Sequence, residues 1–344
     1  ISDEPWLNYA YHIDATAYAK FLRSFSEGFG VKRIEGMIDN VKLSADSESI
    51  ESVRLKTGQI IEGDLFIDCS GLRGLLIEQA LHTGYEDWSH WLPSDSAVAV
   101  QTEAVAAPVP YTRSIAHESG WQWQIPLQHR VGNGLVYCSR YISDEDAKQT
   151  LLNNIQGKTL TEPRFIKYRT GRRLKGWNKN CVALGLASGF IEPLESTSIH
   201  LVSSGLIRLL RLFPIEGINQ VTIDEYNRQS LLEIENVRDF IVLHYHATQR
   251  NDSPFWRHCR TMPIPPSLAH RIKLFKETGR IYIAGDELFR LDSWTQVMIG
   301  QGITPERYHP VVNDMSNEEL SSFLQGYRES VAKYVATLPS HEDF

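Results

Sequence analysis

Residues 185–198, with the sequence GLASGFIEPLESTS, combine the residue types that could bind an anion beside a flat ligand. The small residues let a planar molecule approach the backbone, and the run at 196–198 falls where the first N–H groups of a helix would face an anion. Glu192 and Glu195 add two carboxylates beside that position. A capping box flanked by surface acids would use the same residues, and the sequence alone leaves both interpretations open.

A second candidate is the run WQWQIP at 121–126, in which Trp121, Trp123 and Ile125 alternate with other residues. Side chains of a strand alternate between its two faces, so these three would share one face. Spacing alone favours a packed sheet face over a ligand surface.

Other polar groups are weaker candidates. Arg172 and Arg173 could hold a phosphate near Trp177, although a solvated edge is the simpler interpretation. His244 and His246 lie two apart in a helical stretch and therefore point in different directions, which argues against a shared metal ion.

The elements that position these residues follow from periodicity and turn residues. Strand-like runs between residues 31 and 70 form a hairpin and then a buried strand at 65–67, which passes through Asp68-Cys69-Ser70-Gly71 into a helix starting at 72–76. Alternation over 95–142 predicts an antiparallel sheet with a tight turn at Gly132-Asn133-Gly134. Residues 182–185 form another buried strand.

Helical spacing and capping residues predict several helices. The first covers residues 15–28, with Asp14 as its N-cap, and we expect it to pack in the ordinary way. The others are a segment that begins at Ser143, residues 199–213 and residues 223–246. The last third of the chain is therefore mainly α-helical. The only composition shift suited to a domain boundary lies near residues 214–222.

Composition narrows the class of protein. The chain has 344 residues, 42% hydrophobic and 22% charged, enough for one large core or two packed domains, which excludes a disordered chain. A net charge of −7 argues against a nucleic-acid or membrane partner. Four scattered cysteines predict reduced thiols in the cytoplasm, with neither disulfides nor a zinc site. The first residue is Ile, so we expect an upstream part.

Taken together, three separated motifs resemble the flavin-dependent tryptophan halogenase family. They are WQWQIP at 121–126, FIDCSGLRGLL at 66–76 and GLASGFIEPLEST at 185–197, and the likeness extends to residues 238–257 and 299–305. The chain contains no G-x-G-x-x-G, and the resemblance places that strand-turn-helix in the upstream part.

The resemblance implies an α/β fold like the flavoprotein monooxygenases, with an FAD-binding domain over residues 1–217 and a helical C-terminal domain over 218–344. It implies that FADH₂, supplied by a separate NAD(P)H-dependent flavin reductase, reacts with O₂. A bound chloride or bromide is oxidised to hypohalous acid, which halogenates a small electron-rich aromatic substrate. The oligomeric state, monomer or homodimer, is left open.

Matching motifs carry residue roles onto this chain, each as an implication of the resemblance. Thr197 and Ser198 would bind halide through backbone N–H groups, and Glu195 would be the active-site glutamate. The flavin contacts are Leu186, Ile199 and, more loosely aligned, Ile34 at the adenine; the residues on the substrate side are Trp121, Trp123, Ile125 and Ser196. The paired tryptophans would keep substrate away from the flavin.

Residues 282–302 limit the choice of substrate. Family members that act on free tryptophan clamp the indole with aromatic residues, including a Phe-Trp pair, which this shorter segment lacks. An indole or phenol that is larger, or carried differently, therefore fits at least as well as free tryptophan. Two alternatives stay open: a flavin-dependent monooxygenase of the same fold, and an inactive fragment or binding module.

Overall fold

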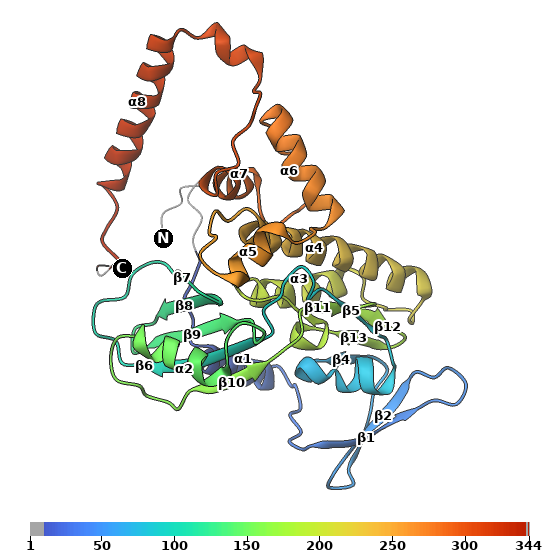
Figure 1. The fold of residues 1–344 in the computed structure, drawn as a ribbon. Helices are drawn as coiled ribbons and strands as arrows, with labels where there is room; N and C mark the ends of the chain where they lie inside the picture. The colour runs from blue at the N-terminus through green and yellow to red at the C-terminus, as the bar shows by residue number, and fades with distance from the viewer. Residues whose placement is uncertain (1–9, 342, 344) are drawn as a thin grey trace.

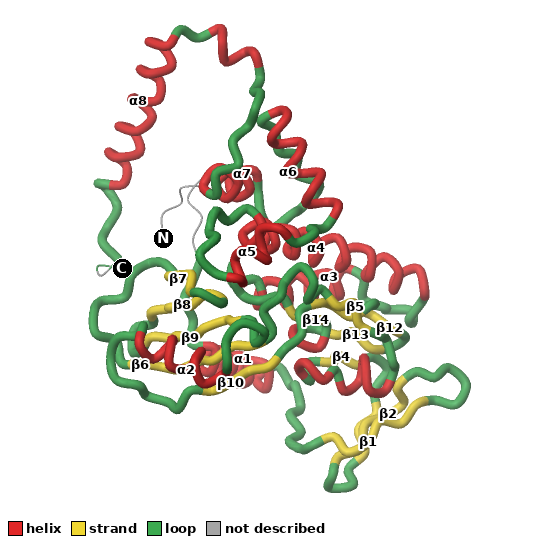
Figure 2. The backbone as a smooth tube through the Cα atoms, viewed as in Figure 1, coloured by secondary structure: helices red, strands yellow, loops and turns green. Residues whose placement is uncertain are grey.

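The computed structural model describes residues 10–341 and residue 343. Strands in this part of the chain form four small sheets, and the helices of the C-terminal third are stacked above them in Figure 1. Figure 2 shows the same division, with the yellow strands in the lower half of the molecule. None of the described helices is both long and apolar enough to cross a membrane.

A parallel pair of strands lies next to the 185–198 segment. β4 (Phe66–Asp68) pairs in parallel with β13 (Cys181–Ala183), which also pairs with β12 (Trp177–Asn178). β13 is fully buried, as its apolar run predicts. Because parallel strands end at the same edge, the 3₁₀ turns after them, η1 (Gly71–Arg73) and η3 (Gly185–Ala187), lie side by side there.

The predicted antiparallel sheet is confirmed. It has five strands in the order β10-β6-β9-β8-β7. Their bounds are β6 (Ser96–Thr102), β7 (Arg113–His117), β8 (Gly120–Pro126), β9 (Val131–Tyr137) and β10 (Arg164–Lys167).

The prediction of a tight turn at Gly132-Asn133-Gly134 is wrong. These residues lie inside β9, and the chain reverses just before it, where the Leu127 N–H donates to the Arg130 carbonyl at 2.8 Å. Gly134 is opposite Trp123, and a Cβ there would lie 2.0 Å from an indole carbon. The glycine therefore makes room for a tryptophan ring rather than for a turn.

Two further sheets are small. The first contains the predicted hairpin and a third strand: β1 (Ile38–Leu43), β2 (Ile50–Leu55) and β3 (Ile60–Glu62). The second is antiparallel and contains the strand just before the candidate site: β5 (Tyr85–Asp87), β11 (Gly171–Arg173) and β14 (Gly189–Phe190).

The predicted helices are confirmed, with shifts of a few residues at their ends. Their bounds, with those of the helices that follow, are α1 (Ala15–Gly28), α2 (Asp144–Asn153), α3 (Ser198–Arg211), α4 (Gln220–His246), α5 (Pro254–Thr261), α6 (Pro266–Thr278), α7 (Leu291–Gly300), η4 (Pro310–Asp314) and α8 (Asn317–Val335). Asp14 and Ser143 act as N-caps, as predicted.

The expectation of ordinary packing for α1 is wrong. The helix buries none of its residues, and Phe21 and Phe25 are 61% and 55% exposed. The physical reason is that no other described element covers its apolar face.

The largest hydrophobic cluster joins the five-stranded sheet to the helices above it. It includes Trp121 and Val136 from the sheet and Phe240, Phe255 and Trp294 from three helices. Ile191, from the segment between β14 and α3, is part of the same cluster. The candidate site is therefore held between the sheet and the helical layer.

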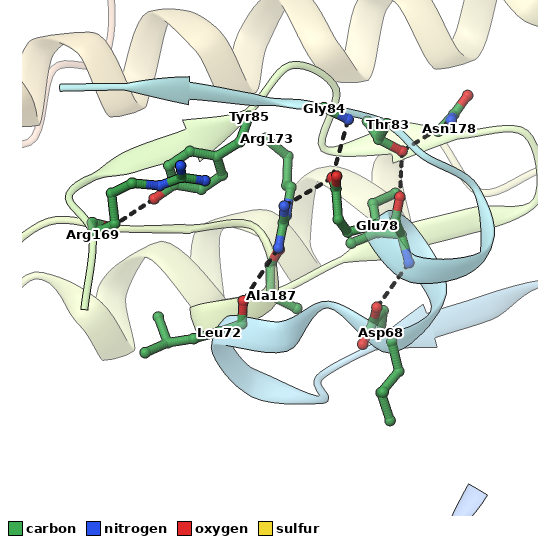
Figure 3. A network of polar contacts seen from close by, with 12 residues as sticks. Asp68, Leu72, Glu78, Thr83, Gly84, Tyr85, Arg169, Arg173, Asn178 and Ala187 are labelled. Carbon is green, nitrogen blue, oxygen red and sulfur yellow. Dashed lines mark hydrogen bonds and ion pairs between the residues drawn. The ribbon is translucent and has the colours of Figure 1, made fainter. Parts of the chain in front are cut away.

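Figure 3 shows a polar network around the turn after β4. Asp68 ends β4, is 1% exposed, and accepts hydrogen bonds from the N–H groups of Ser70, Leu76 and Ile77 at 2.8–2.9 Å. The helix predicted from 72–76 is η1 followed by η2 (Leu75–Ala80), a single π-helical turn.

The solvated-edge interpretation of Arg172 and Arg173 is wrong, and their binding of a phosphate stays untested. Arg173 is 6% exposed and contacts Glu78 at 2.8 Å, and its Nε donates to the carbonyl oxygen of Ala187 (Figure 3). Arg172 pairs with Glu86 at 2.7 Å, with 15% of its side chain exposed. Both arginines thus hold neighbouring elements together inside the protein.

Candidate functional site: the loop between β14 and α3

The path from β14 into the loop depends on two glycines. Gly189 pairs with β11 so closely that a Cβ would lie 2.5 Å from the carbonyl oxygen of Gly171. Both glycines have positive φ angles, 153° and 148°, which other residues rarely adopt. β14 ends at Phe190, whose ring centroid lies 4.4 Å from that of Tyr168.

The N-terminus of α3 has no side-chain cap. Thr197 is the N-cap residue, yet its side chain makes no capping hydrogen bond, and the first backbone bond of the helix runs from the Leu201 N–H to the Thr197 carbonyl at 2.9 Å. The capping-box interpretation is therefore wrong. Ser196 enters the helix with a φ of 55°, a strained angle for a non-glycine residue. Uncapped N–H groups with partial positive charge suit an anion.

Glu195 contacts a histidine that the sequence did not connect with it. Its Oε1 lies 2.9 Å from His244 Nε2, and the two side chains are 35% and 17% exposed. His244 Nδ1 lies 2.8 Å from the carbonyl oxygen of Phe240 on the same helix, α4. The helical periodicity of 223–246 places His244 on α4, but nothing in it indicates which loop the imidazole faces.

This geometry fixes the number of protons that Glu195 and His244 share. A carbonyl oxygen can only accept, so Nδ1 must carry a proton. A hydrogen bond between Nε2 and Oε1 then needs one further proton, either on the imidazole or on the carboxyl group. When it is on the imidazole, Glu195 is a carboxylate held by one oxygen, and its Oε2 can face a substrate.

Glu192 is fully buried, so its interpretation as a surface acid is wrong. Burial raises its pKa to about 7, although the side chains of Tyr245, Trp121 and Ser94 and the charge of His244 lower it. Trp121, at 4% exposure, lies with its indole N–H toward this carboxylate. The structure thus joins the WQWQIP motif to the 185–198 segment.

The other tryptophan-motif residues lie as predicted on the same face of β8. Trp123 and Trp121 have ring centroids 6.1 Å apart, and Trp123 packs against the main cluster while part of it stays exposed. Ile125 is also half-buried. The packed-face interpretation therefore describes Trp121 and fits the other two only in part.

Leu186 and Ile199, the predicted flavin contacts, lie exposed near the edge where β4 and β13 end. They are 44% and 51% exposed, on η3 and on the first turn of α3. η3 packs against α3, since a Cβ on Gly185 would lie 3.4 Å from Val202. Ligands of α/β proteins often bind outside the carboxyl ends of parallel strands, and the assignment of these two residues to the flavin stays a prediction.

Ile34 lies on the coil between α1 and β1 and is 45% exposed. Its assignment to the adenine stays a prediction. No group of three His, Cys, Asp or Glu side chains in the described part of the chain is arranged to hold a metal ion.

Comparison with known proteins decides the family. The family model described as "Tryptophan halogenase" matches residues 2–317. The chain belongs to the tryptophan halogenase family. It is 34% identical to tryptophan 7-halogenase RebH of Lentzea aerocolonigenes, an alignment that covers 98% of this chain and 68% of RebH.

Solved structures of halogenases share the fold. Xcc4156, a flavin-dependent halogenase from Xanthomonas campestris, is 55% identical with a TM-score of 0.98 over 100% of this chain and 69% of that one. BrvH, from Brevundimonas sp. BAL3, is 45% identical with a TM-score of 0.94 over 97% and 68%. This member of the tryptophan halogenase family therefore has the FAD-binding fold of flavin-dependent enzymes, and it spans about two thirds of their length.

Proposed function

We propose that this chain forms the halide and substrate side of an FADH₂-dependent halogenase that modifies an indole-like or phenolic aromatic compound. The observation that carries the proposal is the uncapped start of α3 next to a glutamate held by His244. Family membership supports a flavin-dependent reaction, with FADH₂ from a separate reductase. When bound, reduced flavin supplies, with O₂, the oxidising power that the halide needs.

The chain's own residues would bind the halide and move a proton. Backbone N–H groups at Thr197 and Ser198 would bind chloride or bromide, because their dipoles attract an anion without adding a competing nucleophile. Leu186 and Ile199 would contact the flavin ring from the apolar side of the same edge.

Glu195 would act on the substrate. Halogenation of an aromatic carbon by hypohalous acid would form a carbon–halogen bond and break the halogen–oxygen bond, so that hydroxide leaves and the ring carbon loses its proton. With the shared proton on His244, the Oε2 of Glu195 can accept the ring proton, and His244 keeps the carboxylate oriented. Ser196 and the partly exposed Trp123 and Ile125 would lie on the substrate side.

The decisive experiment uses the full-length protein with an NADH-dependent flavin reductase, O₂, chloride or bromide, and a panel of indoles and phenols. We expect halogenated product by mass spectrometry, and none without halide. Oxygenated product that forms without halide would instead indicate a monooxygenase. Protein that gives neither product would count against catalysis.

The Glu195→Gln variant tests the proton-accepting role. Removal of a general base lowers the rate by about 10²–10⁴-fold, so we expect a loss of that order with unchanged thermal stability. Glu216→Gln, a change of an exposed glutamate beyond the end of α3, is the matched control and should retain full turnover. Equal activity of Glu195→Gln and the wild type would remove Glu195 from the mechanism.

A further inference from the structure

Glu192 is an acid at the centre of an apolar cluster. Its side chain is 0% exposed, while Trp121, Tyr168, Tyr245, Cys138 and Cys259 belong to the main hydrophobic cluster and are each at most 9% exposed. A charged group in such surroundings is costly unless other groups stabilise it. The proposed chemistry at Glu195 does not use Glu192, so its burial calls for another explanation.

Three hydrogen-bond donors converge on this carboxylate from separate parts of the chain. They are the Trp121 indole N–H on β8, the Tyr245 hydroxyl on α4 and the Ser94 hydroxyl between β5 and β6, and each lowers the pKa of Glu192. Within the described chain, these three donor atoms form no hydrogen bond of standard geometry. The two carboxylate oxygens of Glu192 form none either. The indole N–H can only donate and therefore suits a carboxylate oxygen, whereas the two hydroxyls can donate or accept.

The backbone connects Glu192 to Glu195 through two tight turns. The Leu194 N–H donates to the Glu192 carbonyl at 2.9 Å, and the Ser196 N–H donates to the Pro193 carbonyl at 3.0 Å. Glu195 lies between these bonds, so movement of Glu192 moves the catalytic carboxylate with it. A misplacement of about 1 Å can lower a rate about 10²-fold.

Charge provides a second connection. A protonated His244 attracts the Glu192 carboxylate, and the same imidazole contacts Glu195. The other titratable groups near Glu192 are Tyr168, Tyr245, Cys138 and Cys259, whose pKa values are raised by burial and which stay neutral near pH 7.

We propose that Glu192 is a positioning residue for Glu195: its buried carboxylate, which faces Trp121, Ser94 and Tyr245, fixes the loop that carries Glu195. This inference rests on the proposed function, since it assigns Glu192 to the same reaction. It also gives Trp121 a second task, as a donor that faces Glu192 rather than only a screen between substrate and flavin.

An experiment that does not depend on halogenation tests the position of Glu195. In protein labelled with ¹⁵N-histidine, the Nε2 signal of His244, assigned with a His244→Gln variant, reports the contact between His244 and Glu195. We expect Glu192→Gln to shift this signal, because a displaced Glu195 changes the contact. An unchanged signal would overturn the proposed positioning role, whether or not the protein halogenates anything.

Kinetics test the positioning role. For Glu192→Gln we expect kcat to fall about 10- to 100-fold with little change in KM, because a correctly bound substrate meets a misplaced Glu195. We expect the wild-type kcat to rise as the pH passes about 7, where Glu192 ionises, and we expect this rise to be absent from the variant. A rise that persists unchanged in Glu192→Gln would overturn the proposal.

A double-mutant cycle separates this connection from a general packing effect. Trp121→Phe keeps an aromatic side chain but removes the five-membered ring with its N–H, and with Glu192→Gln it should cost no more than Glu192→Gln alone. Trp123→Phe, the same change in the indole that covers Gly134, is the matched control, and its effect should multiply with that of Glu192→Gln. Independent effects of Trp121 and Glu192 would contradict the proposal. A wild type without halogenated product would instead defeat the proposed function and leave the imidazole measurement valid.

Discussion

Asp68 and Glu192 are both buried acids, yet their surroundings differ. Asp68 accepts three backbone N–H bonds at 2.8–2.9 Å and thereby fixes the turn and the π-helical segment after β4. Glu192 faces three side-chain donors without a hydrogen bond of standard geometry. Burial alone therefore does not distinguish an acid that holds a fold together from one prepared for a reaction; the donors around it do.

The largest expected effect is on stability at Asp68. Asp68→Ala leaves three N–H groups without their acceptor, two of them in buried residues, and hydrogen bonds to a charged group are worth about 1.5–3 kcal/mol each. We expect a loss of about 4 kcal/mol in the free energy of unfolding, measured by urea denaturation. Asp64→Ala, a change at an exposed acid just before β4, should stay within about 0.5 kcal/mol of the wild type. Similar losses in the two variants would contradict the structural role of Asp68.

Glu192 should produce a pH-dependent effect of slightly smaller size. Burial raises its pKa from 4.5 to about 7, so the folded protein retains a proton that the unfolded chain releases. The resulting stabilisation is complete below pH 4.5 and is lost as the pH rises through about 7, a change of about 3 kcal/mol. Glu192→Gln cannot titrate and should lack this change.

Unfolding free energies of the wild type and Glu192→Gln, measured in urea from pH 4 to 8, check this sign. The difference between the two proteins should shift in favour of the variant as the pH rises. Parallel curves would show that Glu192 does not titrate in this range. A stability cost of the ionised form would agree with a group retained for reaction rather than for folding.

The contrast between these acids also shows what a sequence can predict. The local pattern places the strand, the small residues and the helix around 182–213, because each follows from neighbours in the chain. The contacts of Glu192 could not be predicted, since its donors stand at positions 94, 121 and 245. His244 is a similar case: its helix was predictable, but its contact with Glu195 depends on tertiary packing.

The wrong prediction of a turn at Gly132-Asn133-Gly134 has the same origin, because it ignored contacts between strands. Gly132 and Gly134 have the composition of a turn, and the indole of Trp123 on the neighbouring strand explains Gly134 instead. The buried Arg173 was likewise interpreted from its charge alone, and its partner Glu78 is distant in sequence. Local chemistry therefore identified the right segments, whereas the partners across the fold decided what each residue does.

The smallest of these effects concerns Arg173, which joins the Asp68 region to the site by donating to the Ala187 carbonyl of η3. Removal of one member of a buried pair costs about 3–5 kcal/mol, but Glu78 is 33% exposed and water can hydrate it, so we expect about 2 kcal/mol for Arg173→Met. If the structural and reactive regions are separate, kcat should change less than about threefold. Glu78→Gln is the partner variant, and the double variant should cost little more than Arg173→Met. A fall in kcat as large as that of Glu192→Gln would mean that the polar network of Figure 3 also positions Glu195. Asp68 and Glu192 would then belong to one connected unit.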